Sequence, residues 1–483
     1  MARSRLTVLS QDEITAIHGR TMEVLADVGV KIREPRAMAL LVRAGAERDG
    51  DTDRVRIPEA LVREALRSTP KEWTWYAREP NRNLHVGGGE RTRLGPGSAC
   101  THFIDYATGD RRTPTVKDSE DLVRLMDALE YVSINYTPVS IAGVDGSPRH
   151  HEVATLVRDI QNTSKVMVGP SFDGTMARDG LAVAAILAGG EEALRKRPTL
   201  AGYCDPVSPL VHDRMMTETL LEYAAMGQPV FLMCLDLAGA SAPASLAGTL
   251  VQQNAEILSG LLLAFLVNKD APVIYGCVSG AMDMKAGRAA LGGPEFGLLS
   301  AASVQLAHLY GLPCSTGGQS DAKTHDAQAS FEKAMSLLAS VLAGADFVDL
   351  FFGSFDGFNT TSLEQIVIDH DIAGYAFRYA EGIEVSEESL SLDVIRDVGP
   401  GGNFLQSHKA LRDTMRRMPR EYYSPSILDR RPLEGAAGSD RTLLKAAHAE
   451  VERILRDHHP TPLDPDTLRA LEDVLERIRK ESD

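Results

Sequence analysis

The stretch PVFLMCLD (residues 229–236) is followed by a helical pattern at 244–268 and then by a second short apolar run, PVIYGCV (272–278). Both short runs are apolar at nearly every position, which is typical of strands that are buried on both faces. The order strand, helix, strand therefore predicts two parallel strands joined by a helix, which is the repeating unit of an α/β fold.

The same alternation extends in both directions along the chain. The candidate strands are 100–105, 131–137, 165–170, 199–204, 229–236, 272–278, 312–316 and 346–352. Helical patterns separate or follow them near 117–129, 148–162, 174–194, 212–226, 244–268, 294–310, 326–343 and 362–380. Eight such units predict a (β/α)8 TIM barrel. A doubly wound open sheet is the alternative, although no GxGxxG lies between a first strand and its helix.

Two regions of different character flank the predicted barrel. We expect an N-terminal extension of helices and a hairpin at 1–95, a catalytic barrel at 96–395 and a C-terminal helical region at 396–483. The segments RTLLKAAHAEVERILRDH (441–458) and DPDTLRALEDVLERIRK (464–480) are amphipathic. They are expected to pack on the outside of the barrel or against another subunit, so we predict a homo-oligomer.

The composition excludes several classes of protein. A net charge of −16 over 483 residues disfavours nucleic acid and anionic membrane surfaces as partners. The N-terminal stretch MARSRLTVLSQDEITAIH has no apolar core of a signal peptide, and the run LLLAFLV (261–267) is too short to span a bilayer. Five cysteines without a CxxC pair indicate a reducing compartment, so we expect a cytoplasmic protein.

The loops that follow the predicted strands should form the active site. These loops are rich in small and acidic residues, and the last of them, FFGSFDGFNTT (351–361), is crowded with phenylalanine. Aromatic rings beside aspartates suit an organic cation, because ring faces attract a quaternary ammonium group. The alternative is that these phenylalanines only cap the barrel core.

Other motifs have weaker chemical readings. Four cysteines lie near predicted strand ends and would suit zinc, but buried cysteine is also a common core residue, and we expect no protein-bound metal. His150 and His151 are adjacent on a helix, so they would diverge by about 100° and not share a ligand. The glycine pair at 317–318 lies where many barrels bind phosphate, but Asp321 and Asp326 would repel it.

The assembled motifs resemble the trimethylamine methyltransferase family, including members that lack pyrrolysine and act on quaternary amines. The similarity runs from about residue 8 to 425 and is carried by several segments together. They are LSQDEITAIHGRTMEVLADVGV (9–30), VRIPEALVREALRSTP (55–70), YAREPNRNLHVGGG (76–89), ATGDRRTPTVKDSEDLVRLMDAL (107–129), AGTLVQQNAEILSG (247–260), GGPEFGLLSAASVQLAHLYGLP (292–313) and GGQSDAKTHDAQASFEKA (317–334).

The resemblance implies a barrel that moves a methyl group from an amine to the cobalt of a corrinoid (cobalamin) carried by a separate corrinoid protein. The founding branch of the family carries pyrrolysine, whereas this sequence contains only standard residues. That difference favours a quaternary amine such as glycine betaine, carnitine, proline betaine or choline. Because a quaternary amine leaves as a neutral amine, the protein must mainly align the reactants and exclude water.

Residue roles follow from the resemblance and the loop positions. The expected substrate-binding residues are Tyr136, Tyr203, Asp205, His212, Phe352, Phe355, Phe358 and His370. The residues expected to face the corrinoid are Asp236, Ser279, Met282, Asp283, Gly317, Gly318 and Gln319. If the substrate carries a carboxylate, His212, His370, Arg214 or Lys323 are the candidates to orient it.

The charged stretch at 317–334 is interpreted mainly as scaffolding. Asp321 and Lys323 are expected to pair with each other or with neighbouring loops. Asp326 is expected to cap a helix whose apolar face is Phe331, Met335, Leu338 and Leu342.

Two other functions remain open at this point. One is a lyase or isomerase on the same barrel that acts on a small organic anion, for which Lys285, Lys323 and Asp321 are weak support. The other is a barrel without catalysis that binds a small cation or a partner protein. The fold by itself does not separate them.

Overall fold

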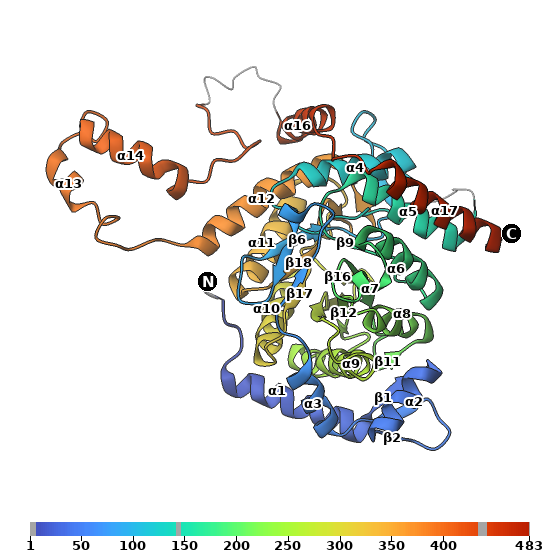
Figure 1. Cartoon of the computed structure of the whole chain (residues 1–483). Helices are drawn as coiled ribbons and strands as arrows, with labels where there is room; N and C mark the ends of the chain where they lie inside the picture. The colour runs from blue at the N-terminus through green and yellow to red at the C-terminus, as the bar shows by residue number, and fades with distance from the viewer. Residues whose placement is uncertain (1–5, 142–145, 433–441, 483) are drawn as a thin grey trace.

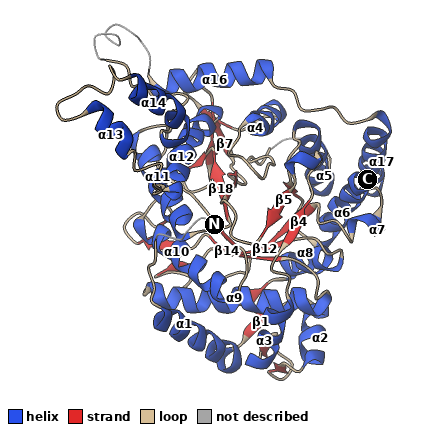
Figure 2. Cartoon of the chain, turned by 60° about the vertical axis from the view of Figure 1, so that its left-hand side comes forward, coloured by secondary structure: helices blue, strands red, loops and turns tan. Residues whose placement is uncertain are grey.

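A curled parallel sheet forms the centre of the molecule (Figures 1 and 2). The computed structural model describes residues 6–141, 146–432 and 442–482. Seven strands follow the order β6–β18–β17–β14–β12–β10–β9, each parallel to the next. Their bounds are β6 Arg93–Pro96, β9 Met167–Val168, β10 Leu200–Cys204, β12 Val230–Cys234, β14 Val273–Cys277, β17 Cys314–Thr316 and β18 Phe347–Phe352.

The crossover helices cover the outer face of this sheet. They are α4 Val116–Ala128, α5 Pro148–Asn162, α6 Gly174–Ala188, α8 Arg214–Ala225, α9 Leu246–Val267, α10 Pro294–Leu309, α11 Ala327–Ala343 and α12 Leu363–Glu381. The predicted α/β alternation is confirmed. The predicted helix at 174–194 is two helices, α6 and α7 (Glu191–Leu194), because Gly189 and Gly190 take positive φ values of 89° and 123° and end α6.

Two predicted strands are corrected by the structure. The first strand of the curled sheet is β6 and not 100–105, because β7 (His102–Ile104) pairs instead with β8 (Arg111–Arg112) and β20 (Thr360–Thr361) in a separate sheet. Residues 131–137 form no regular strand. Single parallel bridges join Val132 to Leu94 and Ile134 to Val166, so this segment lies between the two edges of the seven-stranded sheet.

A hairpin of the N-terminal extension fills one end of the space inside the sheet. It consists of β4 (Trp73–Trp75) and β5 (Leu84–Val86). Trp75 is fully buried, and its ring centroid lies 6.0 Å from that of Phe231 and 6.3 Å from that of Phe347. Its indole N–H donates to the Thr199 carbonyl at 3.1 Å. The extension thus contributes to the core of the predicted catalytic region.

The rest of the N-terminal extension lies along α9. It contains α1 Gln11–Glu23, η1 Val24–Val28, β1 Val30–Ile32, α2 Pro35–Ala44, β2 Glu47–Arg48, β3 Arg54–Arg56, α3 Glu59–Ser68 and η2 Pro80–Arg82. Helices α1, α2 and α3 all contact α9. Strand β1 also pairs with β11 (Val211–His212), which fixes the loop after β10.

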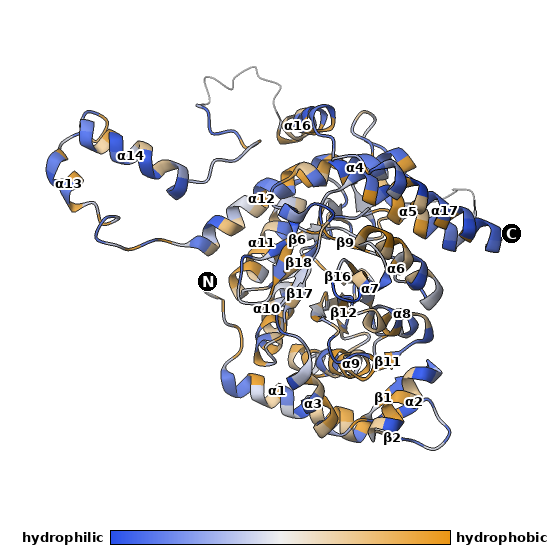
Figure 3. Cartoon of the chain, in the orientation of Figure 1, coloured by the Kyte–Doolittle hydropathy of each residue, from blue (hydrophilic) through white to orange (hydrophobic). Residues whose placement is uncertain are grey.

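Helix α9 is long and apolar enough to cross a membrane by length and composition. However, 72% of its most apolar window is buried inside the fold, against the N-terminal helices, α8 and strands β12 and β14. Its apolar residues, orange in Figure 3, therefore belong to the core of the protein.

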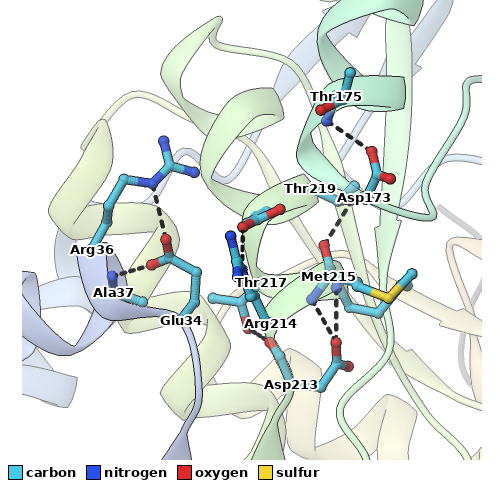
Figure 4. Close-up of polar contacts among 12 residues, drawn as sticks. Glu34, Arg36, Ala37, Asp173, Thr175, Asp213, Arg214, Met215, Thr217 and Thr219 are labelled. Carbon is cyan, nitrogen blue, oxygen red and sulfur yellow. Dashed lines mark hydrogen bonds and ion pairs between the residues drawn. The ribbon is translucent and has the colours of Figure 1, made fainter. Parts of the chain in front are cut away.

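Acidic side chains fix the starts of two crossover helices (Figure 4). Asp173 caps α6 through the backbone N–H of Thr175 at 2.8 Å. Asp213 caps α8 through the backbone N–H groups of Met215 and Met216 at 2.7 and 3.1 Å. Caps of this kind stabilise a helix by about 1 kcal/mol each. The second cap also holds the first turn of α8 in place, where Met216 contributes to the pocket described below.

The C-terminal region divides into a projecting arm and two packed helices. Helices α13 (Leu392–Val398) and α14 (His408–Glu421) extend away from the rest of the chain (Figure 1). Helix α16 (Leu443–Asp457) packs on α12 and α4, and α17 (Pro465–Ser482) packs on α5 and α6. The described parts of 441–458 and 464–480 thus pack on the outside of the central unit, which is one of the two positions expected from the sequence.

Candidate functional site

A pocket of about 410 Å³ lies at the carboxyl ends of the parallel strands. Its walls come from the segments that follow β6, the 131–137 segment, β9 and β10, with α5 and α8 at the side. The lining residues include Ser98, Ala99, Tyr136, Thr137, Ser140, His151, Glu152, Thr155, Asp159, Ser171, Phe172, Tyr203, Asp205 and Met216. This is the end of the sheet at which barrel enzymes carry their active sites.

Two tyrosines form the floor of this pocket, and one buried aspartate lies behind them. The hydroxyl groups of Tyr136 and Tyr203 lie 3.1 Å apart. Both donate to the carboxylate of Asp349, Tyr203 through a short hydrogen bond and Tyr136 through a long one of 3.5 Å. Asp349 is fully buried, on β18, behind the two hydroxyls. The floor therefore presents two aromatic rings that are backed by a carboxylate.

Burial controls the protonation of this triad. It raises the pKa of both tyrosines well above the usual range, with further help from the nearby Asp349, so both phenols stay neutral donors. Burial also raises the pKa of Asp349 to about 6, and the hydrogen bonds from Tyr203 and Tyr136 oppose that rise. At pH 7 and above, Asp349 is mainly ionised and places a negative charge under the pocket.

The neighbouring strand makes room for Asp349. A Cβ atom on Gly95 of β6 would lie 1.8 Å from Asp349 Oδ1, a distance that no real contact allows. The β18–β6 ladder also shifts register between Val348 and Phe352, and Leu350 has a φ of 60° inside that irregularity. A bulge of this kind re-aims side chains next to active sites.

We predict that Gly95→Ala disables the site more than it destabilises the fold. The new methyl group must displace the Asp349 carboxylate from the tyrosine hydroxyls. Because a misplacement of about 1 Å can reduce rates by about 100-fold, kcat/KM for a reaction in this pocket should fall by that order. Gly19→Ala is the matched control, since a Cβ there meets nothing within 4 Å. Equal activity of both variants would contradict the role of Gly95.

Acidic side chains occupy the wall of the pocket. Glu152 and Asp159 both come from α5, seven residues apart and thus on one helical face, and Asp205 follows β10. Burial raises the pKa of Asp159 to about 7, although the backbone N–H of Thr137 donates to it at 2.8 Å. Burial also raises the pKa of Glu152.

His151 is the only basic residue among the described residues that line the pocket. Burial lowers its pKa, and the nearby Arg158 and His150 lower it further. The imidazole is therefore neutral near pH 7 and adds no positive charge to the pocket.

Three of the predicted substrate-binding residues, Tyr136, Tyr203 and Asp205, line the pocket together. The other five lie outside it. Phe352 and Phe355 are fully buried, and Phe352 stacks edge-on against Phe351. Phe358 is partly buried against the apolar cluster inside the sheet.

The two predicted histidines lie elsewhere in the fold. His212 is buried on β11, where its Nε2 lies 2.7 Å from Ser259 Oγ, and burial lowers its pKa to about 4. His370 lies on α12 and stacks on Tyr131 with ring centroids 4.5 Å apart. Neither histidine lines the pocket.

The residues predicted to face the corrinoid lie around the loops after β12, β14 and β17, and none of them lines this pocket. Asp236, Ser279 and Gln319 are fully buried. Gln319 donates to the Leu350 carbonyl and to Ser354 Oγ, so it holds the irregular part of β18. Gly317 and Gly318 pack against Phe296 and Phe351, while Met282 is partly exposed and Asp283 is exposed, both on β15 (Gly280–Asp283).

The charges in the 317–334 stretch tie neighbouring loops together, as predicted. Lys323 pairs with Asp356 at 2.6 Å, and Arg111 and Arg288 pair with the same carboxylate at 3.1 and 3.0 Å. Asp321 accepts hydrogen bonds from the backbone N–H groups of two residues after β16 (Arg288–Ala290), at 3.2 and 2.8 Å. Asp321 and Lys323 do not pair through their side chains.

One detail of that stretch is confirmed and another is wrong. Asp326 caps α11, as predicted, through the backbone N–H of Gln328. The predicted apolar face is wrong, because Phe331 and Met335 are 67% and 56% exposed. The helix instead buries the face that carries Lys333 and Leu337. On that face, Lys333 forms a fully buried ion pair with Asp369 at 2.9 Å.

A second acidic group lies behind β12. Cys234, Asp236 and Glu256 are buried, and their ligand atoms all lie within 4.8 Å of one another, so these three could hold a metal ion. Burial raises the pKa of both carboxyl groups, that of Asp236 to about 7. A shared proton explains their closeness equally well, and none of the three lines the pocket.

Sequence reasoning missed Asp349, Glu152, Asp159 and Phe172. Asp349 carries a signal, because it is the only charged residue at the centre of the apolar run FVDLFF (347–352). The spacing of Glu152 and Asp159 on one helical face carries another. Phe172 carries none, since its place depends on where the segment after β9 turns.

The fold is a mixed α/β fold with a curled, seven-stranded parallel sheet, and the candidate pocket lies at the carboxyl ends of its strands. The trimethylamine methyltransferase (MTTB) family model matches residues 2–483. A glycine betaine methyltransferase from Desulfitobacterium hafniense is 35% identical over 480 residues, covering 99% of this chain and 98% of that protein. A trimethylamine methyltransferase from Methanosarcina barkeri is 37% identical over 490 residues, covering 98% and 96%.

The chain therefore belongs to the trimethylamine methyltransferase family, and the resemblance seen in the sequence is confirmed. Among solved structures, the monomethylamine methyltransferase of Methanosarcina barkeri shares the fold, with a TM-score of 0.52, 13% identity and 97% of each chain covered.

Proposed function

We propose that this protein transfers a methyl group from a quaternary amine to the Co(I) corrinoid of a partner corrinoid protein. Membership of the methyltransferase family supports the reaction class. The observation that carries the proposal is the floor of the pocket, where two tyrosine rings are backed by the buried Asp349 carboxylate. Ring faces and a negative charge together favour a quaternary ammonium group.

The chain's own residues would bind and align the donor. Tyr136, Tyr203 and the half-exposed Phe172 are the aromatic surfaces of the pocket. The corrinoid supplies the nucleophile that takes the methyl group, and the electron pair of the broken C–N bond stays on the departing neutral amine. No proton transfer is needed, so the reaction requires no general acid or base from the lining residues.

The rim of the pocket suits the approach of a large flat cofactor. Ser98, Ala99, Ser140 and Ser171 are among the lining residues, and their small side chains allow close approach. The lyase or isomerase alternative receives no such support, since Lys285, Lys323 and Asp321 do not line the pocket.

Anaerobic spectroscopy tests the proposal. The purified protein is mixed with reduced cobalamin, or with the reduced cognate corrinoid protein, and a panel of quaternary amines. Loss of the Co(I) absorption and appearance of methylcobalamin with at least one amine is the expected result. Failure with every amine and with both corrinoid acceptors would overturn the proposal.

The affinity for a quaternary cation should increase with pH. The cation itself does not titrate, whereas the carboxyl groups of Asp349, Asp159 and Asp205 have pKa values of about 6, about 7 and about 7. All three become ionised as the pH rises from 5.5 to 8, so the pocket becomes more negative and the Kd for tetramethylammonium should fall by about 3- to 10-fold. Calorimetry measures this without cobalt. A Kd that is flat or rises with pH would contradict the prediction, and Asp159→Asn should flatten the upper part of the profile.

Further parts of the proposal concern assembly and location. We propose a (β/α)8 barrel in which 131–137 takes the eighth position, supported by the single bridges on its two sides. We also propose a cytoplasmic homo-oligomer. The support for self-association is the α13–α14 arm, where Leu392, Ile395, Leu405, Met415 and Met418 are at least half exposed.

Apolar surface of this extent suits a permanent partner such as a second copy, because obligate homodimer interfaces are more hydrophobic than transient ones. Light scattering on the intact chain and on the Leu405→Glu/Met415→Glu variant tests this. A monomeric intact chain would refute the proposal of self-association.

A further inference from the structure

The pocket is acidic and offers no cationic side chain to a ligand. Glu152, Asp159 and Asp205 line it, and Asp349 lies behind its floor. No lysine or arginine is among the described residues that line it. The one lining histidine, His151, is neutral near pH 7 for the reasons given above.

Arg158 is the cation nearest to the pocket. Its guanidinium donates to the lining Thr155 Oγ1 at 2.7 Å, and its charge partly opposes the burial that raises the pKa of Glu152 and Asp159. Arg149, at the start of α5, pairs with Asp179 and Glu481 on the outer side. The cluster of Arg111, Arg288 and Lys323 converges on Asp356. None of these residues lines the pocket.

This arrangement discriminates between two kinds of quaternary amine. A betaine carries a carboxylate a few bonds away from its ammonium group. Above pH 7, where Asp159 and Asp205 with pKa values of about 7 are mostly ionised, binding a betaine here would bring its carboxylate among other negative charges. Removing a carboxylate from water without a cation or a full set of donors is strongly unfavourable. Specificity of this kind arises from repulsion of the wrong ligand as well as from attraction of the right one.

We infer that the methyl donor is a quaternary ammonium cation without a carboxylate, carrying a neutral alkyl or hydroxyalkyl tail. This inference rests on the proposed function and names the substrate class of the same pocket. The hydroxyl groups of Ser98 and Ser140 on the lining can hydrogen-bond to a neutral hydroxyl tail. Choline has this chemistry, whereas glycine betaine has the same head group with a carboxylate in place of the hydroxymethyl group.

The decisive experiment is a comparison of choline and glycine betaine on the full chain. Calorimetry without corrinoid gives the Kd of each, and methylation of the reduced corrinoid acceptor gives kcat/KM of each. We expect choline to bind at least about tenfold more tightly and to be the better donor. Tighter binding of glycine betaine, or equal binding of the two, would overturn the inference while leaving the proposed function standing.

The same measurements test the proposed function separately from the inference about ligand charge. If choline binds more tightly than glycine betaine but no amine methylates either corrinoid acceptor, the inference about ligand charge holds and the methyl transfer does not. If no quaternary amine binds at up to millimolar concentration, both are wrong.

A charge substitution in the wall sharpens the test. Glu152→Lys places a cation beside the ligand on α5, so the preference should shift toward glycine betaine by at least about tenfold relative to the intact chain. Glu152→Gln should weaken choline binding and leave glycine betaine equal or improved. Glu192→Lys on α7, an exposed glutamate away from the pocket, is the matched control for the change in net charge. An unchanged choline-to-betaine ratio in Glu152→Lys would refute the role of the acidic wall.

Discussion

Asp349→Asn should lower kcat/KM for methyl transfer by about 30- to 150-fold, which corresponds to ~2–3 kcal/mol, while the protein stays folded. The amide keeps the size of the side chain and can still accept a hydrogen bond from Tyr203. It removes the negative charge that lies behind the two rings of the floor. In a buried site, a charge next to a bound cation acts with little screening.

Whether Asp349→Asn changes KM or kcat distinguishes a role of Asp349 in binding the amine from a role in aligning it. If Asp349 only attracts the cation, KM for the amine rises and kcat is unchanged. If it also orients the Tyr136–Tyr203 pair against the donor, kcat falls as well. Steady-state kinetics with the corrinoid acceptor at saturation measures both constants.

Glu34→Gln is the matched control for losing a buried carboxylate. Glu34 is 3% exposed and bonds to Arg36 and to the backbone N–H of Ala37 in the N-terminal extension (Figure 4). Its loss should affect stability and leave KM unchanged. Activity of Asp349→Asn within twofold of the intact chain would show that the charge under the floor does not contribute to the reaction.

The sequence predicts the repeating part of the fold well and its exceptions poorly. Strands such as 230–234 and 273–277 are buried on both faces, so their apolar runs are unambiguous. Strand β6 has the sequence RLGP, and its glycine is needed to accommodate Asp349, so no apolar run reveals it. The more apolar 100–105 region is predicted as the strand instead, although it pairs in a separate sheet.

The site is predictable only where its residues directly follow strands. Tyr203 and Asp205 come at the end of β10, and Tyr136 ends the 131–137 segment, so strand position places all three. The sequence predicts Phe355 as a substrate-binding residue, because the loop after the last strand is crowded with phenylalanine and ring faces attract a quaternary ammonium group. It is buried, with the edge of its ring against His325, since the register shift in β18 turns the chain. Local sequence does not determine that turn.

Trp75→Ala should destabilise the fold by about 3–5 kcal/mol, the range for removing a buried tryptophan from a core. Trp75 is fully buried and joins the N-terminal hairpin to Phe231 and Phe347 inside the sheet. Denaturant unfolding measures the loss. Trp75→Phe keeps most of the packing and removes the hydrogen bond to the Thr199 carbonyl, so its cost should be nearer 1 kcal/mol. Trp73→Ala, on the same strand but only partly buried, is the control for losing an indole.

Trp75→Ala should also weaken ligand binding in the pocket. Phe231 contacts Trp75 on one side and Tyr203 on the other, where the ring centroids lie 5.2 Å apart. A cavity in place of the indole lets Phe231 relax away from Tyr203, which weakens the support of the floor. We therefore expect Trp75→Ala to raise the Kd for quaternary ammonium cations severalfold at temperatures where the variant is still folded. Destabilisation with an unchanged Kd would contradict this expectation. It would show that the hydrogen bonds among Tyr203, Tyr136 and Asp349, which do not involve Phe231, are enough to hold the floor in place.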